Sequence, residues 1–165
     1  MFVSDDDELG YTETVKHKIF TTDDIPVNQP FRRIPPSQYQ EAKEHIQKLL
    51  EQGIIHESHS PYSSPLVLVQ KNGSLRTCVD YRRLNAQTVK DAHPLPRIQE
   101  SFDALQGASW FSTLDLPSGF NQVAVEEEDK AKTAFITPFG LFEYNRMPFG
   151  LCKHSLAFPD LCKPS

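Results

Sequence analysis

Cysteine is sparse in this sequence of 165 residues, and long apolar runs and an excess of positive charge are absent; each of these features excludes a class of protein. The three cysteines are odd in number and none lies in a Cys-x-x-Cys spacing, so neither a disulfide framework nor a zinc site is supported. No stretch approaches the run of about 18 apolar residues that a membrane-spanning helix needs, and the N-terminus lacks the pattern of a signal peptide. We therefore expect a protein of a reducing compartment, cytoplasmic or nuclear, that contacts no membrane.

The charge balance is also unlike that of a protein that binds nucleic acid by charge alone. Seventeen Lys and Arg residues face 22 Asp and Glu residues, for a net charge of −5. The acids gather in "SDDDE", "TTDD" and "EEED", whereas "KNGSLR" and "YRRLN" place basic residues in the middle of the chain. These basic residues could therefore still form a local basic groove. The acidic runs near the N-terminus are interpreted as solvated surface.

The N-terminal half combines a polar segment with an amphipathic helix. Residues 1–34 predict an extended arm with one candidate edge strand, "TVKHKIF" at 14–20. The stretch "PPSQYQEAKEHIQKLLEQG" predicts a helix that begins at a capping box of Ser37 and Gln40 and ends at Gly53. One face of this helix carries its apolar side chains, which are Tyr39, Ala42, Ile46, Leu49 and Leu50.

Two hairpins are expected after that helix. Residues 63–81 form two strand-like runs on either side of Asn72-Gly73, the dipeptide that tight two-residue turns favour. A second hairpin is predicted within residues 132–150, turning at Pro138-Phe139-Gly140. Between the hairpins, residues 95–107 predict a short helix and "SWFSTLDL" a buried strand.

Asp115 is the first candidate for chemistry, because it stands at the end of "SWFSTLDL". A carboxylate there can bind Mg²⁺, which prefers oxygen ligands. For one isolated acid, a strand-end residue that caps the "PSG" turn is the commoner case. Phe120, after that turn, could likewise wall a pocket, although a lone Phe is more often a core residue.

Basic side chains supply further candidates. Lys71 and Arg76 lie at and beside the tip of the first hairpin, where they could clamp phosphate groups, although a solvated hairpin tip is the commoner case. Arg82 and Arg83 would face opposite ways if they lay in a strand, and an ion pair with a nearby acid explains either of them. The histidines of "HESH", at 56–59, lack a metal-binding spacing and are interpreted as a surface loop.

Three longer segments together resemble a known family. They are "PYSSPLVLVQKNGSLRTCVDYRRLN", "HPLPRIQESFDALQGASWFSTLDLPSGFNQV" and "KTAFITPFGLFEYNRMPFGLC". In order and spacing they resemble the fingers and palm of reverse transcriptases of gypsy-type LTR retrotransposons, from about residue 13 to residue 152. The resemblance implies an α+β protein with an incomplete polymerase right-hand fold, in which a fingers hairpin and a partial palm sheet have helices packed on them. It divides the chain into an acidic arm at 1–34, fingers and partial palm at 35–152 and a divergent tail at 153–165.

The resemblance also implies a role for each candidate. The pattern L-D-L-x-S-G-[FY] makes Asp115 the first metal-binding aspartate of the palm, with Mg²⁺ as the cofactor, and makes Phe120 the wall against the ribose 2′-OH of an incoming nucleotide. Arg76 corresponds to the arginine that grips the triphosphate, with Lys71 as a second cation. Phe149 and Gly150, in "MPFG", correspond to the segment that lines the nucleotide and template side.

The implied partners are an RNA or DNA template-primer and a dNTP. The family's Tyr-x-Asp-Asp motif is absent from these 165 residues, and after Cys152 the sequence "KHSLAFPDLCKPS" departs from the family pattern. We therefore expect a truncated reverse transcriptase domain that is inactive alone, separated from the remainder of a polyprotein. Its uncovered sheet edges predict marginal stability unless a partner covers them. The alternative is a domesticated module that binds nucleic acid or protein without catalysis.

Overall fold

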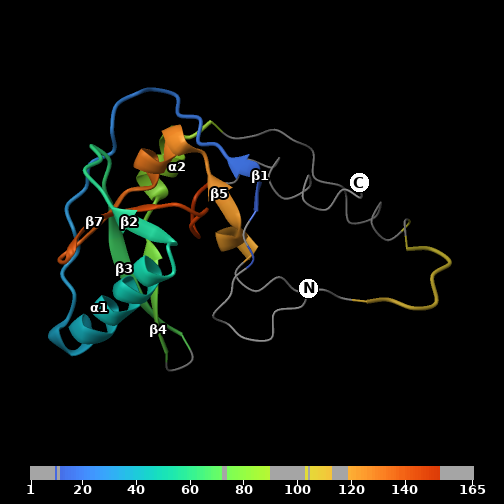
Figure 1. The fold of residues 1–165 in the computed structure, drawn as a ribbon, viewed down its shortest axis with the longest axis horizontal. Coiled ribbons are helices and arrows are strands. Elements are labelled where there is room, and N and C mark those ends of the chain that lie inside the picture. The colour runs from blue at the N-terminus through green and yellow to red at the C-terminus, as the bar shows by residue number, and fades with distance from the viewer. Residues whose placement is uncertain are drawn as a thin grey trace.

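A computed structural model describes residues 10, 12–71, 74–89, 103, 105–112 and 119–152. Helices and strands alternate irregularly along these residues, as expected for an α+β protein (Figure 1). The elements are β1 (Thr12–His17), α1 (Pro36–Glu51), β2 (Ile55–Glu57), β3 (Ser64–Lys71), β4 (Ser74–Val79), α2 (Arg82–Gln87), the 3-10 helix η1 (Gly119–Gln122), β5 (Val123–Val125), the 3-10 helix η2 (Glu127–Thr133), β6 (Phe135–Thr137) and β7 (Gly140–Tyr144).

The main layer is a five-stranded sheet of order β2-β7-β6-β3-β4. Both predicted hairpins are confirmed within it. Strands β3 and β4 pair antiparallel, with Lys71 opposite Ser74, so that the two residues of the Asn-Gly dipeptide join them. Strands β6 and β7 pair antiparallel with Thr137 opposite Gly140. A parallel pairing between β3 and β6 joins the two hairpins into one sheet.

Helix α1 packs on this sheet, where it buries the apolar face that the sequence predicts. Ala42 and Ile46 are buried among core residues of the strands, and the aromatic ring of Tyr39 contacts that of Phe139 with 4.8 Å between centroids. The end of the helix is also as predicted, because Gly53 has a φ of 64° that favours glycine. The N–H of Gly53 donates to the carbonyl of Leu50, which closes the last turn.

The predicted start of α1 is wrong. The helix begins at Pro36 with Pro35 as its N-cap, and no side chain caps it. Ser37 therefore lies inside the first turn and cannot act as the N-cap. Proline suits the first helical position because its φ is already helical and its missing N–H would have had no partner within the helix. Because of the adjacent prolines, the N-cap is Pro35, two residues before the predicted N-cap Ser37.

The strand predicted at 14–20 is present as β1, which begins two residues earlier and ends three residues earlier, at Thr12–His17. This strand pairs parallel with β5 in a separate two-stranded sheet. Just beyond it, the backbone of Ile19 is held on both sides by η2. Its N–H donates to the carboxylate of Asp129 at 2.9 Å, and its carbonyl accepts from the ammonium of Lys132 at 2.7 Å. The residues after β1 are therefore fastened to the body of the protein by side chains distant in sequence.

A short helix, α2, contains the two adjacent arginines, so they do not lie in a strand, where they would face opposite ways. Its one buried residue, Leu84, joins the main core. The ion-pair interpretation of Arg82 is confirmed, because its guanidinium donates to both carboxylate oxygens of Asp80, at 2.8 and 2.7 Å. Arg32, from the segment before α1, donates to the same carboxylate at 2.7 Å.

This charge cluster predicts a dependence of stability on pH. The hydrogen bonds from Arg82, together with the charges of Arg82 and Arg32, lower the pKa of Asp80 to about 2. A carboxyl whose pKa is lowered by folding stabilises the protein above its ordinary pKa, and that contribution is lost as the pH falls through the folded value. Relative to wild type, we expect Asp80→Asn to lower the free energy of unfolding at neutral pH by about 1 kcal/mol.

The difference between the two proteins should narrow as the pH falls from about 4 to about 2, the window set by the ordinary and the lowered pKa values. Urea unfolding of both proteins at several pH values measures it. A difference that stayed constant across this range would show that the Asp80 carboxylate does not contribute through its charge.

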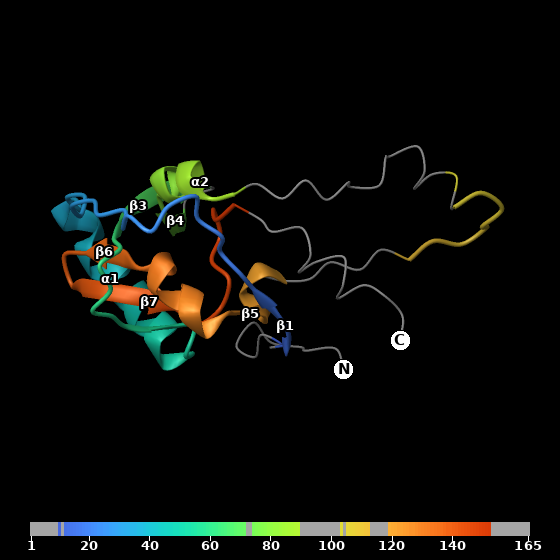
Figure 2. The same ribbon diagram turned by 90° about the horizontal axis from the view of Figure 1, so that it is seen from above.

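The apolar run after residue 108 departs from the prediction of a buried strand. In its described part, residues 109–112, there is no strand, and Trp110 is 92% exposed and Phe111 65% exposed. Residues 105–112 lie away from both sheets (Figures 1 and 2). An apolar run becomes a buried strand only when another strand pairs with it, and within the described part of the chain no strand pairs with residues 109–112. The rest of that run, and most of the predicted helix at 95–107, lie outside the described residues.

Within the described ranges, no helix combines the length and the apolar character needed to cross a bilayer. Cys78 and Cys152 are free thiols, the first exposed and the second half-buried.

Candidate nucleotide site

The hairpin of β3 and β4 carries both predicted cations. Arg76 lies on β4 opposite Val69 of β3, and its side chain is exposed. Lys71 is the last residue of β3, and its side chain lies outside the described part of the chain. The antiparallel pairing, with Lys71 opposite Ser74, thus brings the two positions to the same end of the hairpin, where an exposed guanidinium is available to an anion.

Two of the predicted pocket residues are in contact. Phe120, on η1, and Phe149, after β7, have ring centroids 5.0 Å apart with their planes at 75°, the edge-to-face arrangement that aromatic pairs favour. Phe120 is half-buried and packs on a small core of Val123, Val125 and Met147, whereas Phe149 is 55% exposed. The pair therefore has one side against the core and the other toward solvent.

Gly150 directly follows Phe149 and lies beside the end of β4. Its φ of 92° is a conformation that side chains with a Cβ rarely adopt, and a Cβ there would lie 3.5 Å from the carbonyl oxygen of Val79 and 3.8 Å from the ring of Tyr81. Tyr81 is itself fixed, because its hydroxyl donates to the carbonyl of Thr133 at 2.6 Å, and burial raises the pKa of that hydroxyl. The "MPFG" segment thus lies beside the strand that carries Arg76.

Asn85, on α2, makes two contacts that the sequence analysis did not predict. Its side-chain N–H donates to the carbonyl of Gly150 at 2.7 Å, and its side-chain oxygen accepts from the N–H of Cys152, also at 2.7 Å. No local pattern in "YRRLN" identifies this asparagine, because both of its partners lie more than sixty residues later in the chain.

Asp115 falls outside the described residues, so the structure gives no geometry for the predicted metal ligand. Its carboxylate belongs to the class of ligand that Mg²⁺ prefers. Among the residues that the structure describes, no group of three or more His, Cys, Asp or Glu side chains could hold a metal ion.

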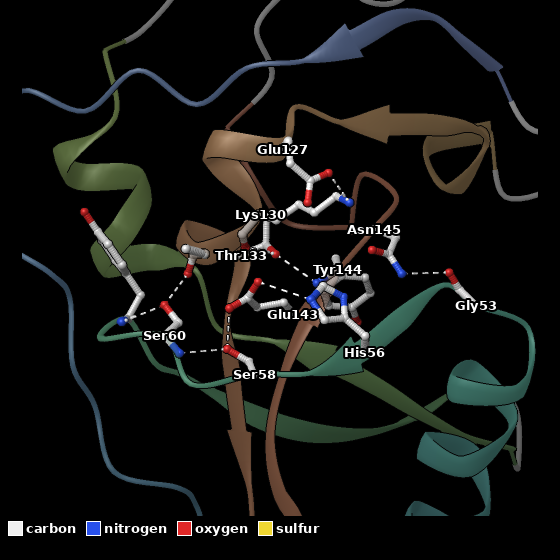
Figure 3. Close-up of polar contacts among 12 residues, drawn as sticks. Gly53, His56, Ser58, Ser60, Glu127, Lys130, Thr133, Glu143, Tyr144 and Asn145 are labelled. Carbon is white, nitrogen blue, oxygen red and sulfur yellow. Dashed lines mark hydrogen bonds and ion pairs between the residues drawn. The ribbon is translucent and has the colours of Figure 1, made fainter.

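A separate polar cluster joins β2 to β7 (Figure 3). His56 lies in β2, so its interpretation as a loop residue is wrong, and its Nε2 is 3.4 Å from a carboxylate oxygen of Glu143. The hydroxyl of Ser58 donates to the other oxygen of Glu143, and the N–H of Ser60 donates to the hydroxyl of Ser58. Because Ser58 contacts the acid rather than the imidazole, the cluster lacks the serine–histidine contact of an activated nucleophile, and we interpret it as a structural link between strands.

Comparison of the sequence with models of protein families identifies a family. The model of the family "Reverse transcriptase (RNA-dependent DNA polymerase)" matches residues 69–158, more than half of the chain. A Drosophila melanogaster Pol polyprotein from transposon 297 is 38% identical over 151 residues, which cover 88% of this chain and 14% of that polyprotein. The Pol polyprotein from transposon gypsy of the same species is 40% identical over 120 residues, which cover 68% of this chain and 12% of that polyprotein.

Solved structures give the same family. The prototype foamy virus protease-reverse transcriptase, in a crystal structure of its CSH mutant, matches with a TM-score of 0.79 and 26% identity over 94% of this chain and 21% of that one. A foamy viral protease-reverse transcriptase solved in complex with double-stranded DNA matches with a TM-score of 0.74 and 25% identity over 94% of this chain and 27% of that one. The chain thus spans between 12% and 27% of the length of each of these four proteins.

Proposed function

The chain belongs to the reverse transcriptase family, and we propose that it forms the fingers and the first part of the palm of a retrotransposon RNA-directed DNA polymerase. The observation that carries this proposal is the contact between Phe120 and Phe149, whose rings meet at 5.0 Å. The family resemblance assigns each of them separately to the nucleotide pocket, and they come from segments that are distant in sequence. In this proposal the arm is residues 1–34, the fingers and partial palm are residues 35–152, and the tail is residues 153–165.

The chemistry of the proposed site is phosphoryl transfer from a nucleoside triphosphate. Arg76, with Lys71, neutralises the triphosphate, because a guanidinium donates two parallel hydrogen bonds to phosphate oxygens and an ammonium adds a point charge. Phe120 closes the pocket where a ribose 2′-OH would lie and so favours a deoxynucleotide. Phe149 and Gly150 line the side of the nucleotide and the template.

Asp115 is the proposed ligand for Mg²⁺, which in this reaction class lowers the charge of the phosphates and activates the attacking oxygen. A single carboxylate is too little negative charge to hold two such ions with a triphosphate between them. The family's partner acids belong to the Tyr-x-Asp-Asp motif, which these 165 residues do not contain. We therefore propose that the 165-residue chain, tested by itself, does not polymerise nucleotides.

Template-primer duplex is the proposed partner. The matched foamy viral enzyme was solved with double-stranded DNA, which supports a nucleic-acid partner for the shared part of the fold. The net charge of −5 requires that binding depends on local cations rather than on overall charge. The exposed side chain of Arg76 meets this requirement.

A salt titration tests this function. We expect a fluorescently labelled RNA/DNA hybrid to bind the chain at low salt and to dissociate steeply as salt rises, because each neutralised phosphate releases counterions.

Binding of dATP tests the nucleotide site. Addition of dATP to the complex should protect the backbone amides of the β3–β4 hairpin against hydrogen exchange. Arg76→Ala should lower the affinity for dATP about tenfold, because it removes a charged hydrogen bond. Lys43→Ala, on the exposed side of α1, removes the same charge elsewhere and should leave dATP affinity unchanged. No hybrid binding at low salt would refute the proposed partner.

A further inference from the structure

Asn85 fastens the segment after β7 to helix α2 by both ends of its carboxamide. It donates to the carbonyl of Gly150 and accepts from the N–H of Cys152, each at 2.7 Å. Both partners are backbone groups, and they lie on either side of Leu151, a core residue that is 7% exposed. A donor and an acceptor on one rigid amide fix the orientation of the segment as well as its position.

The fastened segment is the one that carries the exposed aromatic ring of the pocket. Phe149 directly precedes Gly150, whose φ of 92° sets the direction of the chain at that point. A backbone shift at Gly150 would therefore move the ring of Phe149 relative to that of Phe120, since their edge-to-face contact depends on a separation of 5.0 Å.

The other end of the link is the fingers hairpin. Helix α2 follows β4 after two residues, and the N–H of Asn85 donates to the carbonyl of Tyr81, the second of these residues. Strand β4 carries Arg76. The Asn85 side chain thus joins α2, the helix that follows the strand of Arg76, to the segment of Phe149, whose ring contacts the proposed sugar-side wall Phe120.

We propose that Asn85 is a positioning residue of the nucleotide site, which sets Phe149 against Phe120 and so determines how strictly the pocket distinguishes deoxyribose from ribose. This role rests on the proposed function. It differs from a purely structural role, because loss of the clamp alters the choice between two sugars rather than only the amount of folded protein.

The experiment uses the 165-residue chain and measures the affinities of dATP and ATP, each with Mg²⁺, by isothermal titration. Asn85→Leu keeps the shape of the side chain and removes both hydrogen bonds, so we expect the ratio of dATP to ATP affinity to fall about threefold to tenfold. Asn85→Asp keeps an acceptor for the Cys152 amide but has no N–H for the Gly150 carbonyl. It should lower the ratio as well, while hydrogen exchange at the Cys152 amide stays slow.

Ala86→Ser is the matched control, because it changes the neighbouring exposed position of α2 and should alter neither the ratio nor the exchange rate. An unchanged ratio in both Asn85 variants, with both nucleotides weakened equally, would overturn the positioning role. Thermal unfolding identifies any variant that fails to fold, and Asn85→Asp then decides the question.

Failure of the proposed function gives a different result. If the wild-type chain binds neither nucleotide, the nucleotide site itself is refuted. The inference about Asn85 is then judged by nuclear Overhauser contacts between the rings of Phe120 and Phe149. Loss of these contacts in Asn85→Leu supports the positioning of the pair, and their persistence overturns it.

Discussion

Primer extension by the 165-residue chain is expected to be undetectable with Mg²⁺ on both RNA and DNA templates. The chain supplies too few metal ligands. Asp115 is the only carboxylate that the resemblance assigns to the metals, and two-metal phosphoryl transfer needs further ligands. Denaturing gels of a labelled primer, with all four dNTPs, measure the product. Extension by this purified chain would refute its proposed inactivity.

The same assay tests Asp115 when the chain is joined at residue 152 to the following palm and thumb residues of a related Pol polyprotein. We expect this longer protein to extend primers, and Asp115→Asn to slow extension by a factor of about a thousand, since a metal site supplies several kcal/mol of transition-state stabilisation. Asp24→Asn, an exposed acid of the arm, is the control and should extend primers at the unchanged rate.

Two results would contradict the role of Asp115 or of the whole chain. Equal rates for Asp115→Asn and the unmutated fusion would exclude Asp115 as a metal ligand. No extension by the fusion, together with salt-sensitive hybrid binding by the 165-residue chain, would favour the alternative of a binding module without catalysis.

Phe135→Ala is expected to remove most of the stability of the fold. Phe135 is fully buried on β6, and its ring contacts those of Phe142 and Tyr144, with 5.7 and 5.1 Å between centroids. Truncation of such a ring leaves a cavity and costs about 3–5 kcal/mol. Because domains of this size are stable by only about 5–15 kcal/mol, this variant should be partly unfolded at 37 °C.

Urea unfolding followed by circular dichroism measures the loss of stability. The control is Phe31→Ala, which removes the same ring from a position that is 52% exposed and should change the free energy of unfolding by no more than about 0.5 kcal/mol. Equal losses in the two variants would mean that the sheet is not the stabilising centre of the molecule.

The comparisons confirm the family, the retrotransposon origin of its relatives and the resemblance to part of a polymerase fold, all of which the motifs predict. The roles of Asp115, Lys71, Arg76, Phe120, Phe149 and Gly150 stay predictions, and so do the cofactor Mg²⁺ and the division into arm, fingers and tail.

Prediction from sequence failed where several local signals competed or where none existed. The capping-box pattern at Ser37 lost to the prolines before it, because proline already has a helical φ. Helix α2 has only six residues and no side-chain cap, so the sequence offered no start signal for it. His56 lies in a three-residue strand, which is too short for an alternating pattern to emerge.

The sequence by itself determined the elements whose signals are local. The Asn72-Gly73 dipeptide fixed the register of the first hairpin, and the helical spacing of Ala42 and Ile46 fixed the buried face of α1. Such signals act between residues a few positions apart, so they survive without knowledge of the rest of the fold.

Only the tertiary structure decided which of these elements meet. Residues distant in sequence are joined by the sheet order β2-β7-β6-β3-β4 and by the contact of Phe120 with Phe149. The hydrogen bond from the Asn85 side chain to the carbonyl of Gly150 also joins distant residues. These contacts form because apolar faces must be buried together and buried backbone groups must find partners, conditions that the whole chain satisfies at once. The candidate site is therefore a property of the packed fold, because the sequence names its candidate residues separately and gives no sign of Asn85, which joins two of its elements.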